Sequence, residues 1–509
     1  MTRVGDIFWG QTWPSKNGFI EIGQTHRVVP VVRRLLADEA NAVGIYRRVA
    51  REEPGTFILE SAEHDGTWNR WSFIGASSCA TLFSKDGTVW WEGDVPAGIP
   101  RTGSLVDVVS GTLDVLHTPP VEGLPPLTSG LVGALGWDTI AEWEPQLRPT
   151  NPREVNTPDV ALLLASDMVA VDHFDGSVWL IANAINGNGL STGIEAAYDH
   201  AVARLDAMEE RLREPLDLDV KRVQAGAAQP DVHYRVSEDD FCATVEACKR
   251  HVVDGDVFQV VPSQRLDVAC EATPLDVYRV LRTVNPSPYM YLVNARSKDG
   301  DFAIVGASPE TLMRLRGGEL TTFPIAGSRP RSGDPDVDRQ RAEELLADPK
   351  ERSEHLMLVD LARNDLSKVG KPETVRVDGF MRVLKFSHIM HITSTVSTQV
   401  REGVGAMDCL AATFPAGTLS GAPKPKAIEL INRYEPARRG FYGGVIGHID
   451  FTGDADLAIA IRTAIIADGR AWVQAGAGIV ADSDPRTEFL ETTTKAQAAL
   501  KAVRIAATL

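Results

Sequence analysis

Residues 348–366 read DPKERSEHLMLVDLARNDL, and this stretch decides how the second half of the chain is interpreted. Asp348 is a favourable N-cap and Pro349 suits the first helical position, so a helix is predicted to begin here. Glu351 and Glu354 then lie three residues apart on one face of that helix. The stretch therefore predicts a helix that presents a pair of carboxylates near its positive N-terminal end.

The same arrangement recurs near the C-terminus. Asp484 and Pro485 again combine a cap with a first helical residue, and Glu488 and Glu491 again lie three residues apart. Two such helices offer hard oxygen ligands to Mg²⁺, which takes one or two carboxylates and completes its coordination with water and substrate oxygens. The alternative is that both pairs are solvated acidic first turns, which the helix dipole also favours.

Composition excludes several classes of protein. A formal net charge of −17 over 509 residues argues against nucleic acid and anionic membranes as partners. We find no apolar run of the roughly 18 residues that a membrane span needs, and no apolar core of a signal peptide near the start. The five cysteines are scattered without a CxxC pair. We therefore expect a cytoplasmic protein with reduced, structural thiols.

The first half of the chain predicts mostly strands. Residues 1–25 are expected to be irregular, and residues 28–39 are expected to form a short amphipathic helix. The remaining predictions are helices at 104–116 and 194–213, strands at 56–61, 68–74, 130–136, 160–171 and 177–184, and a hairpin over 80–92.

Residues 214–232 lack sustained periodicity and are the predicted boundary between domains 1–225 and 235–509. Long strands joined by hairpins predict an α+β fold with two large antiparallel sheets facing each other and helices outside. In the second half, helices are predicted at 237–254 and 274–285. Strands are predicted at 257–268, 289–295, 302–307, 311–316, 320–324, 389–400, 442–451, 457–468 and 470–480.

Three features of the second half could bind or transform an anion. The small residues 476–478 let backbone N–H groups approach an anion, although close packing explains them equally well. Arg462 follows an apolar strand, where it could bind a carboxylate bidentately or form a structural salt bridge. Glu310 lies at a turn, where burial would suit it to act as a general acid, unless it is simply exposed.

Two loops and two histidines are further candidates. The loops 324–331 and 413–426 combine glycines with hydroxyl and basic side chains, so each is either a ligand loop or a plain turn. His388 and His391 face opposite sides of a predicted strand, which argues against a shared metal. A single histidine on a strand is otherwise a packed, hydrogen-bonded residue.

Taken together, these segments resemble one family, the chorismate-utilising enzymes, and within it the component I subunits of anthranilate synthases. The resemblance is specific over 241–502 and weaker over 54–138. It is carried by PIAGSRPR, DPKERSEHLMLVDLARNDL, FSHIMHITS, FPAGTLSGAPKPKAIE, YGGVIG, AIAIRTAI and QAGAGIVADSDPRTEFLETTTKA.

The resemblance implies roles for individual residues. It implies Mg²⁺ as cofactor, with the ligands Glu354 and Glu491 and, as outer partners through water, Glu351 and Glu488. It implies three catalytic residues: Glu310 as the acid near the departing C4 hydroxyl, His391 in pyruvate loss, and Ser328. The implied chorismate-binding groups are Gly327, Ser328, Tyr442, Arg462, Gly476, Ala477, Gly478 and Lys495.

Two positions distinguish members of this family. Relatives that add water have a lysine base where this chain has Gln259, and aminodeoxychorismate synthases often have a nucleophilic lysine where it has Ala326. The resemblance therefore implies that ammonia adds to chorismate and that anthranilate and pyruvate form. No cysteine lies in a GxCxG motif, so a separate glutamine amidotransferase subunit is expected to supply ammonia. A heterotetramer or a homodimer is expected.

The resemblance also implies feedback inhibition by L-tryptophan, whose biosynthesis begins with this reaction. The matching residues, which also suit a strand end and a helix stopped by proline, are Leu59, Glu60, Ser61, Asn285, Pro288, Tyr289 and Met290. Two alternatives stay open. One is another chorismate enzyme, aminodeoxychorismate synthase first, and the other is a catalytically inactive tryptophan sensor that regulates a partner.

Overall fold

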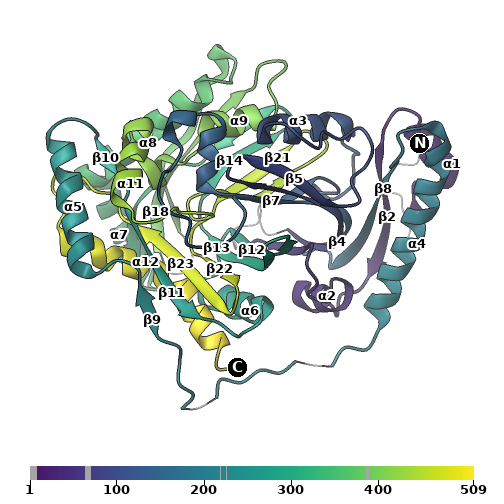
Figure 1. The fold of residues 1–509 in the computed structure, drawn as a ribbon, viewed down its shortest axis with the longest axis horizontal. Coiled ribbons are helices and arrows are strands. Elements are labelled where there is room, and N and C mark those ends of the chain that lie inside the picture. The colour runs from purple at the N-terminus through teal and green to yellow at the C-terminus, as the bar shows by residue number, and fades with distance from the viewer. Residues whose placement is uncertain (1–8, 63–69, 218, 225, 386–388) are drawn as a thin grey trace.

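The computed structural model describes residues 9–62, 70–217, 219–224, 226–385 and 389–509. Its architecture is α+β, as predicted, and its paired strands are antiparallel (Figure 1). Hydrogen bonds join 21 strands into one continuous sheet, and a separate two-stranded sheet pairs β10 with β19. Within the described ranges, no helix combines the length and the apolar character that a membrane span requires.

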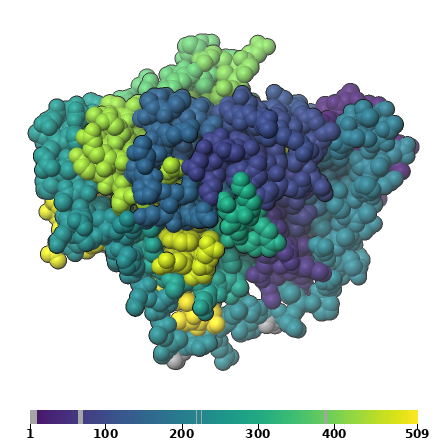
Figure 2. All heavy atoms as spheres, in the orientation of Figure 1, coloured from purple at the N-terminus to yellow at the C-terminus, as the bar shows by residue number. Residues whose placement is uncertain are grey.

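The continuous sheet folds over so that two layers face each other. Side chains from β4, β7 and β8 of the first half share one core with side chains from β12, β13 and β22 of the second. The halves are also joined by strand pairing, since β3 pairs with β12 and β6 with β20. The space-filling view shows the blue part of the first half lying against the yellow-green part of the second (Figure 2).

The strands alternate apolar side chains between these layers and the helices outside. Their bounds are β1 Thr12–Trp13, β2 Val28–Leu36, β3 Thr56–Glu60, β4 Trp71–Lys85, β5 Thr88–Gly93, β6 Leu131–Leu135, β7 Val160–Asp172, β8 Ser177–Ile185, β9 Val232–Tyr234, β10 Gln259–Val260, β11 Ser263–Ala269, β12 Tyr289–Ser297, β13 Gly300–Ser308, β14 Thr311–Arg316, β15 Glu319–Thr322, β16 Ile325–Pro330, β17 Arg376–Lys385, β18 Ile389–Gln399, β19 Gly421–Ala422, β20 Val445–Ile449, β21 Ala455–Ile459, β22 Thr463–Ala467 and β23 Arg470–Gly476.

Helices cover the outer faces in two groups, each with its own apolar core. One core includes side chains of α1, α2, α4, α6 and α12, and the other includes side chains of α3, α5, α8, α9 and α11. The bounds are α1 Lys16–Gly23, α2 Ala42–Val49, α3 Leu105–Val115, α4 Ile194–Arg213, α5 Glu238–Val253, α6 Pro274–Val284, α7 Pro335–Ala347, α8 Pro349–Ser367, α9 Ala406–Thr413, α10 Gly417–Ser420, α11 Lys424–Tyr434 and α12 Pro485–Ala506.

Most of the predicted elements are present, but four predictions are wrong. Residues 257–268 form two strands, β10 and β11, which belong to different sheets. Residues 28–39 form strand β2 instead of a helix, because the run VVPVV is rich in β-branched residues and pairs along β8. Residues 1–25 contain helix α1, capped by the Ser15 side chain. Residues 457–468 form two strands, β21 and β22, because the chain turns between them at Arg462, whose φ is +53°.

The segment after α4 has no regular structure in its described part until β9 begins at Val232 (Figure 1). The two-domain division at this segment stays a prediction. The strand pairs named above cross it, so the halves share hydrogen bonds and a core.

Candidate active site

The N-terminal turn of α8 is built as the sequence predicts. The Asp348 side chain caps the helix by accepting hydrogen bonds from the backbone N–H groups of Lys350 and Glu351 at 3.0 and 3.3 Å. Arg329 of β16 donates to the same carboxylate at 2.9 Å. Partial burial raises the pKa of Glu354, and the neighbouring charge of Glu351 raises it further. The helix thus holds two carboxylates that repel each other.

Helix α12 begins in the same way, with an aspartate cap followed by a pair of glutamates. The Asp484 side chain accepts a hydrogen bond from the backbone N–H of Thr487 at 2.9 Å. Burial raises the pKa of Glu488, and the charge of Glu491 also raises it. Lys495, one turn further on, forms a 2.7 Å ion pair with Glu491 and donates to the carbonyl oxygen of Gly476 at 3.1 Å.

The two helix starts share one electrostatic environment. The charge of Glu491 raises the pKa of Glu354 across the gap between the helices. The charges of Lys350 and Lys495 lower the pKa of both Glu354 and Glu488. Among the described residues, no three His, Cys, Asp or Glu side chains form a closed metal site. This donor set fits Mg²⁺, which takes few carboxylates and fills its other positions with water or substrate oxygens.

Arg462 occupies the turn between β21 and β22, directly beside this carboxylate region. Its Nη1 donates to the carbonyl oxygen of Lys495 at 2.7 Å. Burial lowers the pKa of the guanidinium, while Tyr442, Glu491 and Glu310 oppose that change. Arginine keeps its charge under these conditions, so Arg462 offers a partly desolvated cation to a carboxylate.

The glycine-rich segment after β23 packs tightly against polar side chains. A Cβ on Gly476 would lie 3.0 Å from the Tyr442 hydroxyl, and one on Gly478 would lie 2.5 Å from Nε2 of Gln259. Ala477, between them, is fully buried. A larger residue at position 478 would therefore displace Gln259.

Glu310 lies on the turn between β13 and β14, close enough to Arg462 for their charges to interact. Burial raises the pKa of Glu310 to about 7, although the Thr418 hydroxyl and the charges of Lys495 and Arg462 oppose this change. Thr418 donates to Oε1 of Glu310 at 2.9 Å. A cavity of about 70 Å³ lies beside this pair, with Leu361 in its wall. A carboxyl group with this pKa can hold a proton at neutral pH and donate it.

His391 on β18 is fixed by the bulged strand β16. Its Nδ1 donates to the carbonyl oxygen of Gly327 at 2.8 Å, which makes Nε2 the acceptor nitrogen of the ring. Burial lowers the pKa of His391, and the charge of Arg462 lowers it further. The ring is therefore neutral at pH 7 and suited to accept a proton.

The residues next to Gly327 explain why it is a glycine. Its φ is +63°, and a Cβ would lie 2.8 Å from Oε2 of Glu351. The close approach brings β16 against the start of α8. Ser328 follows in the bulge, is exposed, and makes no side-chain hydrogen bond to any residue within the described ranges. Its predicted catalytic role stays a prediction.

Sequence reasoning missed two residues of this region. Thr418 lies in the loop 413–426, which the sequence predicts as a candidate ligand loop without indicating which of its residues contacts the site. Lys350 follows the helix cap, and its charge acts on carboxylates of two helices. Neither relationship has a sequence signal, because each depends on segments far apart in the chain. His388 lies outside the described residues.

The residues predicted to bind tryptophan lie together at the end of a strand pair. In the register of β3 and β12, Met290 is opposite Glu60 and Tyr291 is opposite Leu59. The Glu60 carboxylate accepts hydrogen bonds from Tyr278, Arg282 and Ser72, and Asn285 donates to Ser287 and to the carbonyl oxygen of Ala307. The remaining two, Pro288 and Tyr289, join Ser287 to Met290 along the chain.

Ser61 is the polar group of this cluster that stands out. Its hydroxyl is buried and has no hydrogen-bond partner among the described residues. The next residue, Ala62, donates its backbone N–H to the carbonyl oxygen of Ser287 at 3.0 Å. An unsatisfied buried hydroxyl beside a strand end suits a site that a ligand completes.

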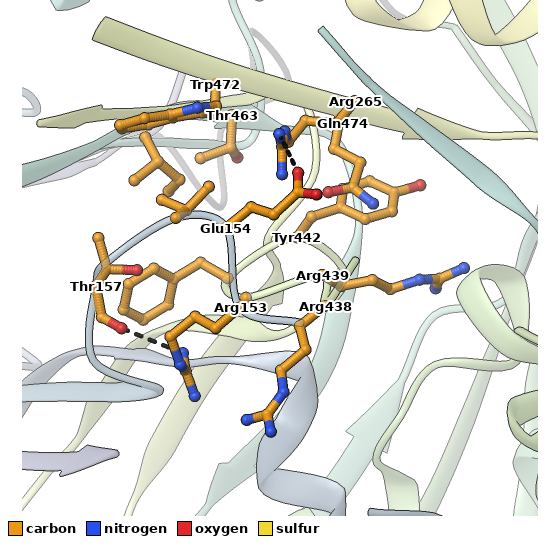
Figure 3. A pocket seen from close by; sticks show the side chains of 14 residues that line it. Arg153, Glu154, Thr157, Arg265, Arg438, Arg439, Tyr442, Thr463, Trp472 and Gln474 are labelled. Atoms are coloured by element: carbon orange, nitrogen blue, oxygen red, sulfur yellow. Dashed lines mark hydrogen bonds and ion pairs between the residues drawn. The ribbon is translucent and has the colours of Figure 1, made fainter. Parts of the chain in front are cut away.

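An arginine-lined cavity of about 30 Å³ lies beside Tyr442, and none of the four paired glutamates lines it (Figure 3). Its arginines are already paired. Arg265 donates to Glu154 at 2.8 Å, and Arg153 donates to the carbonyl oxygen of Thr157 at 3.2 Å. Its size suits one or two water molecules and no substrate.

Comparisons with known proteins agree with this geometry. The family described as chorismate binding enzyme matches residues 102–501. Anthranilate synthase component 1 of Arthrobacter globiformis is 50% identical over 97% of this chain and 94% of its own length. The corresponding protein of Mycolicibacterium smegmatis is 48% identical over the same shares of the two chains.

Solved structures give the same result. The crystal structure of anthranilate synthase component I from Streptococcus pneumoniae matches with a TM-score of 0.75 and 33% identity, covering 86% of this chain and 94% of that one. The menaquinone-specific isochorismate synthase MenF of Escherichia coli matches in fold, with a TM-score of 0.66 and 20% identity over 96% of this chain and 98% of its own. The chain therefore belongs to the chorismate-binding enzymes.

Proposed function

We propose that this enzyme is the component I subunit of an anthranilate synthase, which converts chorismate and ammonia to anthranilate and pyruvate. One observation carries the proposal: an acid (Glu310), a neutral histidine (His391) and the carboxylate Glu491 all interact with the charge of one partly buried arginine, Arg462. Glu491 interacts in turn with the carboxylate pair on α8 through Glu354. The named relatives, at up to 50% identity over nearly the whole chain, support the same reaction.

Each side chain has a chemical task in this proposal. Chorismate carries two carboxylates, and Arg462 with the backbone N–H groups of residues 476–478 binds one of them. Protonated Glu310 donates its proton to the C4 hydroxyl as this leaves as water. Neutral His391 accepts the C2 proton when pyruvate leaves. The Tyr442 hydroxyl, beside Gly476, closes one side of the site.

Glu354 and Glu491 would hold Mg²⁺ directly, and Glu351 and Glu488 would do so through water. When bound, the ion supplies positive charge that orients the second carboxylate and withdraws electrons from the ring. The raised pKa of Glu354 supports this assignment, because neighbouring carboxylates that repel each other are stabilised by a cation.

The nucleophile must come from outside the protein. Position 259 carries a neutral, buried glutamine and position 326 a buried alanine, so neither offers an amine. Burial raises the pKa of the Cys79, Cys248 and Cys409 thiols to about 12, which leaves them unreactive. We therefore propose that ammonia is the nucleophile and that a separate glutamine amidotransferase delivers it.

We also propose feedback inhibition by L-tryptophan at the cluster around Ser61, whose buried hydroxyl has no hydrogen-bond partner within the described ranges. The cytoplasm is the proposed compartment, supported by five cysteines that are all free. A heterotetramer or a homodimer stays the expected assembly.

Fluorescence during turnover tests the proposed function. The purified chain is given chorismate, with and without Mg²⁺ and with and without ammonium at alkaline pH. Fluorescent anthranilate that requires both additions supports the proposal. Chorismate consumption without ammonium would identify water as the nucleophile. A product that fluoresces only after a separate lyase is added would identify an aminodeoxychorismate synthase instead.

A further inference from the structure

The turn that presents Arg462 is conformationally unfavourable. Arg462 has a φ of +53°, a left-handed conformation that residues with a side chain rarely adopt. Such a conformation persists only where the surrounding structure fixes it. The residues on either side of Arg462 are therefore the place to look for what holds the guanidinium in position.

Three hydrogen bonds span this turn, and the longest joins the Tyr291 hydroxyl directly to the carbonyl oxygen of Ile461 at 3.5 Å. The Tyr291 hydroxyl lies 2.6 Å from Oγ1 of Thr463, and the Thr463 hydroxyl donates to the carbonyl oxygen of Ile461 at 2.8 Å. Thr463 thus accepts from Tyr291 and donates to Ile461. These hydrogen bonds tie together the residues immediately before and after Arg462. Tyr291 is only 2% exposed, so water does not compete for its hydroxyl.

The sheet provides a slot for the Tyr291 ring. In the strand register Tyr291 is opposite Gly306 of β13, and Gly306 is in turn opposite Thr463 of β22. A Cβ on Gly306 would lie 2.3 to 2.5 Å from the ring carbons and the hydroxyl of Tyr291. The ring therefore crosses over a glycine to reach the next strand, and no other residue fits at position 306.

Packing alone does not hold Thr463 in place. Thr463 lines the arginine-rich cavity together with Tyr442, as Figure 3 shows, so one side of its side chain borders open space. The hydrogen bonds from and to its hydroxyl therefore help the strand pairing with Gly306 to fix the position of Thr463.

We propose that Tyr291 is a positioning residue for Arg462, and that it couples Arg462 to the strand that carries the tryptophan cluster. Tyr291 directly follows Tyr289 and Met290 on β12, and Met290 is opposite Glu60. A ligand that shifts the start of β12 moves the Tyr291 hydroxyl and, through Thr463, the Arg462 turn. This inference rests on the proposed function for the identity of both ligands.

The test replaces one hydroxyl. Tyr291→Phe keeps the ring in its slot and is expected to raise the KM for chorismate about two- to tenfold, the worth of one neutral hydrogen bond, with kcat within twofold of wild type. Thr463→Val should raise the KM for chorismate by a similar factor, whereas Thr463→Ser, which keeps the hydroxyl, should leave the KM at its wild-type value. In the double variant that combines Tyr291→Phe with Thr463→Val, the KM should rise no further than in either single variant.

Tyr46→Phe is the matched control. Tyr46 is also fully buried and its hydroxyl also makes two hydrogen bonds, with Thr56 and Asn294, but neither partner is hydrogen-bonded to the turn 461–463 within the described ranges. A KM raised equally by Tyr46→Phe, or left unchanged by Tyr291→Phe, would overturn the proposal.

Calorimetry tests whether Tyr291 couples tryptophan binding to chorismate binding. In Tyr291→Phe, tryptophan should bind with its wild-type Kd, while the factor by which tryptophan weakens chorismate binding falls toward one. An unchanged factor overturns the coupling. If the wild-type chain made no anthranilate, the proposed function would fail, and the change in chorismate Kd would still decide the positioning role of Tyr291.

Discussion

The hydroxyl of Thr418 donates a 2.9 Å hydrogen bond to Oε1 of Glu310, across 108 residues of sequence. This bond stabilises the ionised carboxylate and so lowers the pKa of Glu310, in opposition to burial, which raises it to about 7. The balance between these two effects decides how much of the acid is protonated at neutral pH.

We predict that Thr418→Val shifts the alkaline limb of the pH–rate profile. Glu310 must be protonated to act, so activity falls as pH rises through its pKa. Removing a bond that favours the carboxylate raises that pKa, and the limb should move about 0.5 to 1 pH unit higher. The measurement is kcat against pH, with Thr418→Ser as the control that keeps the hydroxyl. A limb that stays in place would remove Glu310 as the acid.

Glu354→Gln and Glu491→Gln should abolish metal binding without unfolding the protein. Each removes one negative charge from a repelling pair, and the ion pair with Lys495 that Glu491→Gln also breaks is partly exposed and weak, so the apo protein should be about as stable as wild type. Mg²⁺ stabilises the wild-type chain by mass action, and that rise in Tm should disappear in both variants. Activity should fall on the order of a hundredfold or more.

Glu343→Gln is the matched control for the metal experiment. Glu343 is an exposed glutamate on α7, and no hydrogen bond or ion pair links its side chain to the described residues. It should leave both the Mg²⁺-dependent rise in Tm and the activity unchanged. A full Mg²⁺ effect in Glu354→Gln would show that the ion binds elsewhere.

The sequence predicts best the features that are encoded locally. Helices α8 and α12 begin where Asp-Pro marks a cap and a first turn, because those interactions lie within three residues. The strand at 28–36 is mispredicted because the apolar residues of VVPVVRRLL recur at a helix-like spacing, while its β-branched residues and its pairing with β8 favour a strand. The break at Arg462 was missed because a left-handed arginine depends on contacts from other strands.

In the candidate site, too, the contacts between distant segments could not be predicted from the sequence. The resemblance to a family supplied its residues, but the bond between Thr418 and Glu310 and the effect of Lys350 on two helices arise only when distant segments meet. Likewise, an apolar run can predict β12 but not that its Tyr291 reaches across Gly306. Tertiary contacts of this kind require the structure.

Ser61→Arg should give an active enzyme that tryptophan does not inhibit. The Ser61 hydroxyl is buried and has no hydrogen-bond partner in the part of the chain that the structure describes, and an arginine there would fill the space that a ligand needs. The strand pair of β3 and β12 does not include position 61, so the sheet should persist. The measurement is the tryptophan concentration for half inhibition, and Ser61→Ala should raise it about fivefold. Inhibition at the wild-type concentration in Ser61→Arg would contradict the assignment.

Asp138→Asn should stabilise the protein most at alkaline pH. Asp138 is 8% exposed, neither carboxylate oxygen has a hydrogen-bond partner among the described residues, and burial raises its pKa from 3.8 to about 7. The unfolded chain therefore releases this proton at lower pH than the folded one, so stability falls by about 1.4 kcal/mol per pH unit between about pH 4 and pH 7. Chemical denaturation should show a gain of about 2 to 4 kcal/mol for Asp138→Asn at pH 8 and almost none near pH 4. Exposed Asp114→Asn, on α3, should show no such difference, and an equal gain at both pH values would mean that Asp138 is ionised in the folded protein.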